Sequence, residues 1–156
     1  MTDFLINSAK TCAFTGHRIL DKEFDIDKVE YYLRLLIKDG IDTFLVGMAI
    51  GFDTECFKLL LRLKKEFDIK LVACVPCLEQ NKKFTASQNA EYLDLLSNAD
   101  KKVVVSENYS PYCMMKRNMF MVDNCCVLIA YIKKETGGTF NTVKYAKQVN
   151  RPIIYL

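Results

Sequence analysis

The chain has 156 residues, of which 51% are hydrophobic and 26% are charged, and its formal net charge at pH 7 is +3. This length and composition predict one globular domain over residues 1–156, with enough apolar side chains for a sizeable core. They exclude a membrane-spanning helix, because no apolar run approaches the ~20 residues that a bilayer requires, and the weak charge excess does not favour a dedicated DNA-binding surface.

The first half of the chain alternates short apolar strands with amphipathic helices. Residues 12–15, 43–46 and 70–75 are apolar with few polar breaks, which is typical of strands buried on both faces. Asp27 and Glu30 form a cap-like start for a first helix, and Gly40 forms its stop. The apolar residues of this helix share one face: Ile26, Val29, Leu33, Leu36 and Ile37. A second helix has a cleaner apolar stripe, at Phe52, Cys56, Leu59, Leu60, Leu63 and Phe67.

The second half continues the alternation. A weaker helical pattern covers residues 87–97, and a strand is predicted at 102–105. Ser110 and Pro111 are suited to the N-cap and first position of a helix that reaches about Asp123. A strand at 125–131, a helix from about Thr139 to Asn150 and a strand at 152–155 complete the pattern. Strands that alternate with helices predict an α/β fold, in which helices cover both faces of a parallel sheet.

Five of the six glycines stand at strand-to-helix turns: Gly16, Gly47, Gly51, Gly137 and Gly138. In a parallel sheet such turns lie along the carboxyl edge, where open α/β sheets bind ligands. Glycine permits positive φ and a close approach of the backbone to a ligand, and helix N-termini offer unpaired N–H groups to an anion. We therefore expect a ligand site at this edge, with tight-turn geometry alone as the alternative reason for the glycines.

Each of these turns also carries polar groups. "TGHR" adds His17 and Arg18, an imidazole and a cation suited to the mouth of a phosphate-binding cleft. "GMAIGFD" adds Asp53, which is suited either to cap the helix or to accept hydrogen bonds from ribose hydroxyls. "TGGTFNT" adds the Thr139 hydroxyl and a Gly-Gly nest suited to phosphate. His17 is either a general base or a hydrogen-bond donor, and no catalytic residue is assigned.

These segments, together with "VPC…Q" and "KRNMFMVDNCCVLIAY", resemble the YpsA-like branch of the SLOG superfamily. That superfamily groups the Smf/DprA DNA-processing proteins with the LOG (lysine-decarboxylase-like) nucleotide hydrolases, and the resemblance runs from about Thr11 to Leu156. It implies a Rossmann-like three-layer α/β/α sandwich with a mostly parallel sheet, which binds a nucleotide or nucleotide-derived ligand. The residues that it assigns to the ligand and phosphate site are Gly16, His17, Arg18, Gly47, Ala49, Gly51, Asp53, Arg117, Asn118, Gly137, Gly138 and Thr139.

The last glycine-rich turn departs from the LOG pattern. LOG hydrolases carry Pro-Gly-Gly-x-Gly-Thr-x-x-Glu, whereas "TGGTFNTVKY" has no proline before the glycines and no carboxylate after them. This departure disfavours hydrolysis of a nucleotide. We therefore expect a cytoplasmic sensor or accessory protein that binds a nucleotide or an ADP-ribose-like ligand, and separately expect no further cofactor and no metal. The alternatives are a nucleotide N-glycosidase and a single-stranded nucleic-acid-binding module, and a homo-oligomer is compatible with each.

The seven cysteines are odd in number, and most lie in apolar runs, which predicts reduced thiols and a cytosolic protein. Cys74 and Cys77 have redox spacing, but Cys74 belongs to a strand, so buried packing is favoured. The N-terminal "MTDFLINSAK" does not have the pattern of a signal peptide. The lysine pairs, interpreted as solvated, are 64–65, 82–83, 101–102 and 133–134.

Arg117 lies in a helical pattern beside a group of methionines that we interpret as core: Met114, Met115, Met119 and Met121. The arginine itself is expected to be either solvated or, by the resemblance, facing a phosphate. Phe84 stands where close relatives are expected to have tryptophan.

Overall fold

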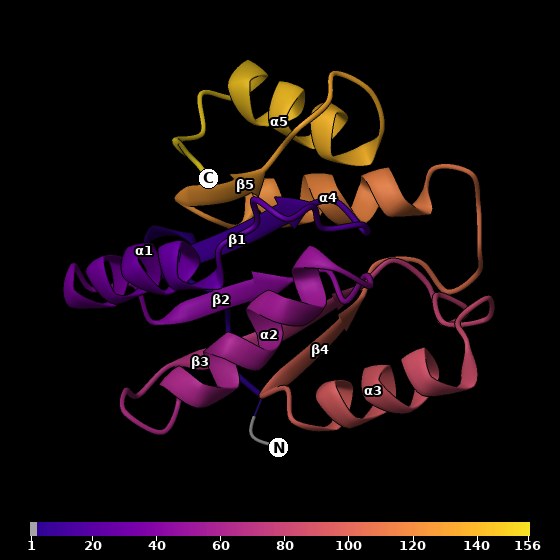
Figure 1. Cartoon of the computed structure of the whole chain (residues 1–156), viewed down its shortest axis with the longest axis horizontal. Coiled ribbons are helices and arrows are strands. Elements are labelled where there is room, and N and C mark those ends of the chain that lie inside the picture. The colour runs from indigo at the N-terminus through magenta and orange to yellow at the C-terminus, as the bar shows by residue number, and fades with distance from the viewer. Residues whose placement is uncertain (1–2) are drawn as a thin grey trace.

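The computed structural model describes residues 3–156, which form one six-stranded sheet with helices on both faces (Figure 1). All neighbouring strands are parallel, in the order β4-β3-β2-β1-β5-β6. This confirms the predicted Rossmann-like three-layer α/β/α architecture. The strands are β1 (Thr11–Gly16), β2 (Thr43–Val46), β3 (Lys70–Val75), β4 (Lys101–Val104), β5 (Val127–Tyr131) and β6 (Ile153–Tyr155).

The helices divide between the two faces of the sheet. A short 3-10 turn, η1 (Ser8–Lys10), precedes β1. The helices α1 (Ile26–Lys38), α2 (Phe52–Leu63) and α3 (Ala86–Ser97) pack on one face. The other face is covered by α4 (Cys113–Asp123) and α5 (Gly138–Gln148).

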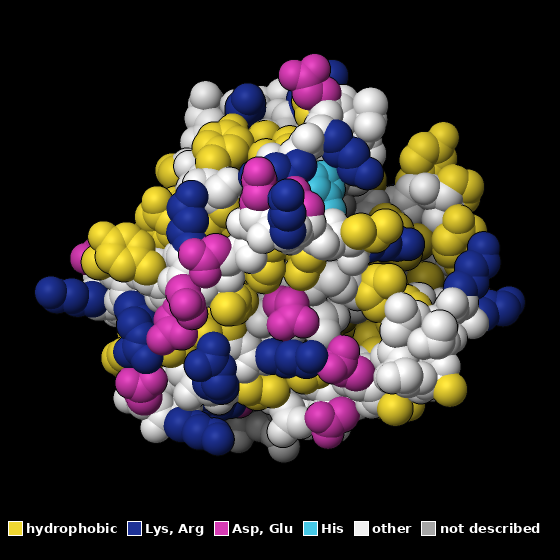
Figure 2. Space-filling view, in the orientation of Figure 1, with side chains coloured by type: hydrophobic (Ala, Val, Ile, Leu, Met, Phe, Trp, Pro, Cys, Tyr) yellow, Lys and Arg dark blue, Asp and Glu magenta, His cyan; other side chains and the backbone are white. Residues whose placement is uncertain are grey.

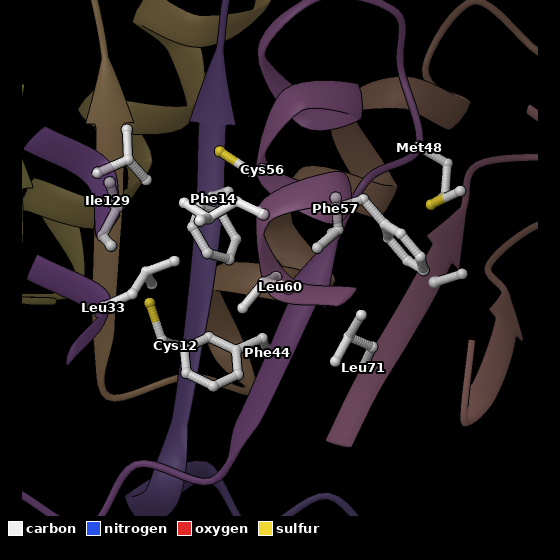
Figure 3. Close-up of a cluster of buried hydrophobic side chains, with 14 of the residues drawn as sticks. Cys12, Phe14, Leu33, Phe44, Met48, Cys56, Phe57, Leu60, Leu71 and Ile129 are labelled. Carbon is white, nitrogen blue, oxygen red and sulfur yellow. The ribbon is translucent and has the colours of Figure 1, made fainter. Parts of the chain in front are cut away.

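The central strands are mostly apolar because alternate side chains enter two different cores. Cys12 and Phe14 belong to the larger core beneath α1–α3, whereas Ala13 between them belongs to the core beneath α4 and α5. Figure 3 shows the larger core, where Phe44 and Leu60 pack together with other buried side chains. A strand buried on both faces has no solvated side, so the few polar residues of β1 and β2, Thr11, Thr15 and Thr43, lie at or next to the strand ends.

Several predicted boundaries differ from the structure, including the end of α2, which is Leu63 rather than Phe67. The N-cap of α1 is Asp25, whose carboxylate accepts a hydrogen bond from the Asp27 backbone N–H at 2.9 Å. The predicted start of α4 at Ser110 is instead a turn, in which the Ser110 carbonyl accepts from the Cys113 N–H at 3.2 Å, and the helix begins at Cys113. The fifth strand begins at Val127, two residues later than predicted.

The strand order fixes where a ligand can bind. From β1 the chain moves outward through β2 and β3 to β4, and it then crosses back to place β5 on the other side of β1. The turns that follow β1 and β5 therefore leave in opposite directions. Such a switch point opens a crevice at the carboxyl ends of the two strands.

Candidate functional site

A cavity of about 750 Å³ lies at this switch point, and its size is typical of small-molecule sites. Figure 2 shows it as a hollow beside the histidine side chain. Its walls come from the turns after β1, β2 and β5 and from α4. Eleven of the twelve predicted site residues line it: Gly16, His17, Arg18, Gly47, Ala49, Asp53, Arg117, Asn118, Gly137, Gly138 and Thr139.

Gly51 is the predicted residue that does not line this central cavity. It has a φ of +85°, and a Cβ on it would collide with the backbone carbonyl of Arg18. The neighbouring Phe52 N–H donates to the His17 carbonyl at 3.1 Å. Gly51 thus holds the turn after β2 against the turn after β1, which places Arg18.

His17 connects the turns after β1 and β5. Its Nε2 accepts a hydrogen bond from the Lys133 backbone N–H at 2.8 Å. Burial lowers the pKa of His17, and the nearby Lys134 lowers it further. The imidazole is therefore neutral at pH 7, with its proton on Nδ1, so Nε2 is not available as a general base.

Tyr131 at the end of β5 supports the wall next to His17, and the sequence did not single it out. Its hydroxyl donates to the Asp21 carboxylate, and its ring stacks on Phe52 with centroids 5.9 Å apart. Burial and the bond to Asp21 raise the pKa of Tyr131 to about 12. The tyrosine therefore stays protonated, and it keeps Asp21 engaged beside the cavity. The sequence did hold a signal for Tyr131, because it ends an apolar strand directly before the glycine-rich turn.

Asp53 and Arg117 form the floor of the cavity, with 7% and 5% of their surfaces exposed. Burial raises the pKa of Asp53 to about 6, although the positive charge of Arg117 opposes this rise. The Asp53 carboxylate accepts from the Ala49 backbone N–H at 3.2 Å. The N-cap of α2 is Gly51, so the expectation that Asp53 caps this helix is wrong. A carboxylate on the first turn of a helix still benefits from the helix dipole.

Arg117 reaches from α4 to the ends of two strands, so the expectation that it is solvated is wrong. Its Nη1 donates to the carbonyls of Gly47 and Cys74, the latter at 3.2 Å, and its Nε donates to Asn118 at 2.8 Å. Gln80 donates to the same Gly47 carbonyl at 3.1 Å. These bonds fix the turn after β2 in place.

Among the methionines around Arg117, the prediction of a core position holds for Met121 alone. Met121 is 2% exposed, whereas Met114, Met115 and Met119 are only half-buried. Met114 also lines the central cavity. The α4 stripe therefore serves the site as well as the core.

Gly47 is glycine because the floor of the cavity leaves no room for a side chain. A Cβ there would lie 2.8 Å from the Arg117 Cζ and 2.9 Å from the Asp53 carboxylate. The next residue, Met48, has a φ of 64°, which side chains rarely adopt. The turn after β2 is thus shaped around the two charged groups.

The N-terminus of α5 forms the opposite wall. Gly137 is its N-cap with a φ of +91°, no side chain caps the helix, and its first turn holds no acidic residue. Positive φ at Gly138 is not found; a Cβ on Gly138 would meet only open space. Thr139 is 6% exposed and lines the cavity beside the unpaired N–H groups of the first turn. This wall is suited to an anion.

The cysteines lie apart from this chemistry. Cys74 and Cys77 are both fully buried, and burial raises the pKa of Cys74 to about 12, so Cys74 is a packed thiol rather than a nucleophile. Across residues 3–156 no group of three His, Cys, Asp or Glu side chains is placed to hold a metal. Over the same residues no helix is long and apolar enough to cross a membrane.

Comparison with solved structures shows a fold shared with DNA processing protein A (DprA). The chain aligns with DprA from Streptococcus pneumoniae with a TM-score of 0.70 and 19% identity, over 94% of this chain and 50% of that one. DprA from Helicobacter pylori aligns with a TM-score of 0.64 and 16% identity, over 96% and 65% of the two chains. The chain thus spans about half of the pneumococcal protein.

Sequence comparison gives closer relatives. The SPbeta prophage-derived protein YoqJ of Bacillus subtilis strain 168 is 31% identical over 127 residues, which are 73% of this chain and 74% of YoqJ. The UPF0398 protein YpsA of the same strain is 24% identical over 147 residues, covering 83% and 79% of the two chains. The YpsA model, described as the YspA SLOG family, matches residues 23–153. The chain therefore belongs to the YpsA family of SLOG proteins.

Proposed function

We propose that the central cavity binds a nucleotide or a nucleotide-derived ligand such as ADP-ribose, in a sensor or accessory role. The observation that carries this proposal is the N-terminus of α5, which opens into a cavity of about 750 Å³ that Arg18, Lys133 and Lys134 also line. Unpaired N–H groups, a helix dipole and several cations together select a phosphate.

The other walls suit the rest of a nucleotide. Asp53 lies on the floor and is suited to accept hydrogen bonds from ribose hydroxyls, while the Nδ1 proton of His17 is a further donor. Met114, which lines the cavity and is only half-buried, offers apolar surface to a base. We thus assign the phosphate to the α5 wall and the sugar to the floor.

The acidic residues of the central cavity favour ligand binding over cleavage of the ligand. Cleavage of an N-glycosidic bond requires a carboxylate near the sugar to activate water. The acids of the central cavity are Asp21, which Tyr131 engages, and Asp53, which accepts from the Ala49 N–H and is assigned above to the ribose hydroxyls rather than to a water molecule. The H. pylori DprA structure concerns binding of single-stranded DNA, which makes oligonucleotides a second class of ligand to test.

A thermal-shift panel of mononucleotides, ADP-ribose and dinucleotides tests the proposal, together with mass spectrometry of molecules that co-purify. Arg18→Ala should weaken binding by about 1.5–3 kcal/mol, the loss of a charge-assisted hydrogen bond, and should leave the unfolding free energy unchanged because Arg18 is exposed. Arg62→Ala, at an exposed arginine of α2, is the matched control. Unchanged affinity with lost stability would make Arg18 structural.

Gly138→Val gives a second test at the opposite wall. Gly138 has no positive φ and faces open space, so valine fits the backbone but occupies the position assigned to the phosphate. The variant should fold normally and lose binding in the thermal-shift assay. Full binding by a folded Gly138→Val protein, or no ligand at all for the wild type, would overturn the proposal.

A further inference from the structure

Two further hollows flank the central cavity. One, of about 530 Å³, is formed by the turns after β2 and β3 and the turn before α4, and it shares Arg18, Ala49 and Met114 with the central cavity. The other, of about 670 Å³, runs beside α5 and shares Lys133 and Lys134 with it. Because each flanking hollow shares lining residues with the central cavity, the three hollows adjoin one another, and together they are called the track.

The positive charge of the protein is concentrated on this track. Its walls contain eight cationic and four acidic side chains, an excess of four, although the formal net charge of the whole chain is only +3. The remaining surface therefore has no positive excess. The cations are Arg18, Lys82, Lys83, Arg117, Lys133, Lys134, Lys144 and Lys147, and the acids are Asp21, Asp53, Glu79 and Glu135.

Aromatic side chains lie in both flanking hollows. The β3 side holds Phe84 and Tyr109, and Tyr109 is 64% exposed. The α5 side holds Phe140 and Tyr155, and Tyr155 is 47% exposed. Exposed aromatic rings beside cations are the means by which proteins bind unpaired bases together with their phosphates. An acidic peptide would use the cations but not the rings.

We infer that this track binds a single-stranded oligonucleotide, with one nucleotide in the central cavity and its neighbours in the two flanking hollows. The inference rests on the proposed function, because the central nucleotide occupies the cavity assigned above. Phosphates would contact Lys144 and Lys147 along α5, and bases would stack on Tyr109 and Tyr155. The strand must be single, because base pairs hide the faces that the rings require.

Fluorescence anisotropy with labelled deoxythymidine and uridine oligonucleotides of one to eight residues tests this inference. Affinity should rise with length over the first few nucleotides and fall as salt is raised. The double variant Lys144→Gln, Lys147→Gln should reduce the slope of log K against log salt by about 1.4, because each phosphate contact on a single strand contributes about 0.7 to that slope. It should also weaken binding roughly ten-fold near physiological salt. Both lysines are exposed on α5, outside the central cavity.

Matched controls lie elsewhere on the surface. Lys38→Gln with Lys65→Gln removes two exposed lysines, one at the end of α1 and one just after α2, and should change neither affinity nor slope. Tyr109→Ala should weaken oligonucleotide binding at least five-fold through lost stacking. Tyr31→Ala removes a tyrosine on α1 of similar exposure, 60%, and should have no effect.

The outcomes separate the two proposals. Mononucleotide binding without any gain from length would overturn the track and leave the proposed function standing. Failure of every mononucleotide, dinucleotide and oligonucleotide, and of ADP-ribose, to bind would overturn both. Equal affinity for a duplex or for polyglutamate, or no change in the Lys144→Gln, Lys147→Gln variant, would also overturn the track. Comparison of the deoxythymidine and uridine series shows whether the track binds DNA or RNA more tightly.

Discussion

Gly47→Ala adds one methyl group at the floor of the cavity. The backbone of Gly47 is not at positive φ, so alanine itself is not strained there. The new Cβ would lie 2.8 Å from both Cζ and Nη1 of Arg117 and 2.9 Å from the Asp53 carboxylate. These distances are shorter than a carbon atom tolerates, so the guanidinium must move.

The loss of unfolding free energy follows from the hydrogen bonds that Arg117 makes. Its Nη1 donates to the Gly47 and Cys74 carbonyls, and hydrogen bonds from a charged donor each contribute about 1.5–3 kcal/mol. Overpacking of a buried site adds about 1–3 kcal/mol. Because Arg117 will retain part of this bonding after it shifts, we expect the unfolding free energy to fall by about 2–4 kcal/mol. For a chain of this length that corresponds to a Tm lower by about 5–15 °C.

Urea denaturation of Gly47→Ala and wild type measures the loss, and Gly138→Ala is the matched control. The same methyl group at Gly138 meets nothing within 4 Å and lies in a helix, so its stability should be unchanged or slightly raised. If Gly47→Ala is as stable as Gly138→Ala, Arg117 does not hold the strand ends together and the account of the cavity floor is wrong.

Three other predictions concern the same site. Burial raises the pKa of Asp53 from 3.8 to about 6, so the folded state favours the protonated acid, and the unfolding free energy should fall as the pH rises from about 4 to about 6. Asp53→Asn should remove this fall and raise the unfolding free energy by up to about 3 kcal/mol at pH 7.5. Urea titrations at several pH values measure both effects. Gly137→Ala should lose about 1–3 kcal/mol, because alanine is strained at a φ of +91°, and a loss no larger than that of Gly138→Ala would contradict this. Incubation of wild type with adenosine monophosphate should release no adenine by chromatography; release that vanishes in Asp53→Asn would make Asp53 catalytic.

The architecture and much of the cavity wall were predictable from sequence because their signals are local. Apolar runs such as residues 43–46 and 70–75 coincide with β2 and β3, since a strand buried on both faces is apolar except at its first residue, here Thr43 and Lys70. The glycine-bearing turns were also predictable as neighbours, because parallel strands bring all their carboxyl ends to one edge. Eleven predicted residues consequently line one cavity.

What only the tertiary structure decided depends on residues distant in the chain. Arg117 bonds to a carbonyl 70 residues away, and the state of His17 is set by a backbone N–H 116 residues away. The lysine pairs 82–83 and 133–134 follow β3 and β5, and the strand order, in which β2 and β1 lie between these two strands, places the pairs in the hollows on opposite sides of the central cavity. Sequence spacing fixes which side chains a strand or helix presents, whereas the order in which strands pair fixes which of those side chains meet.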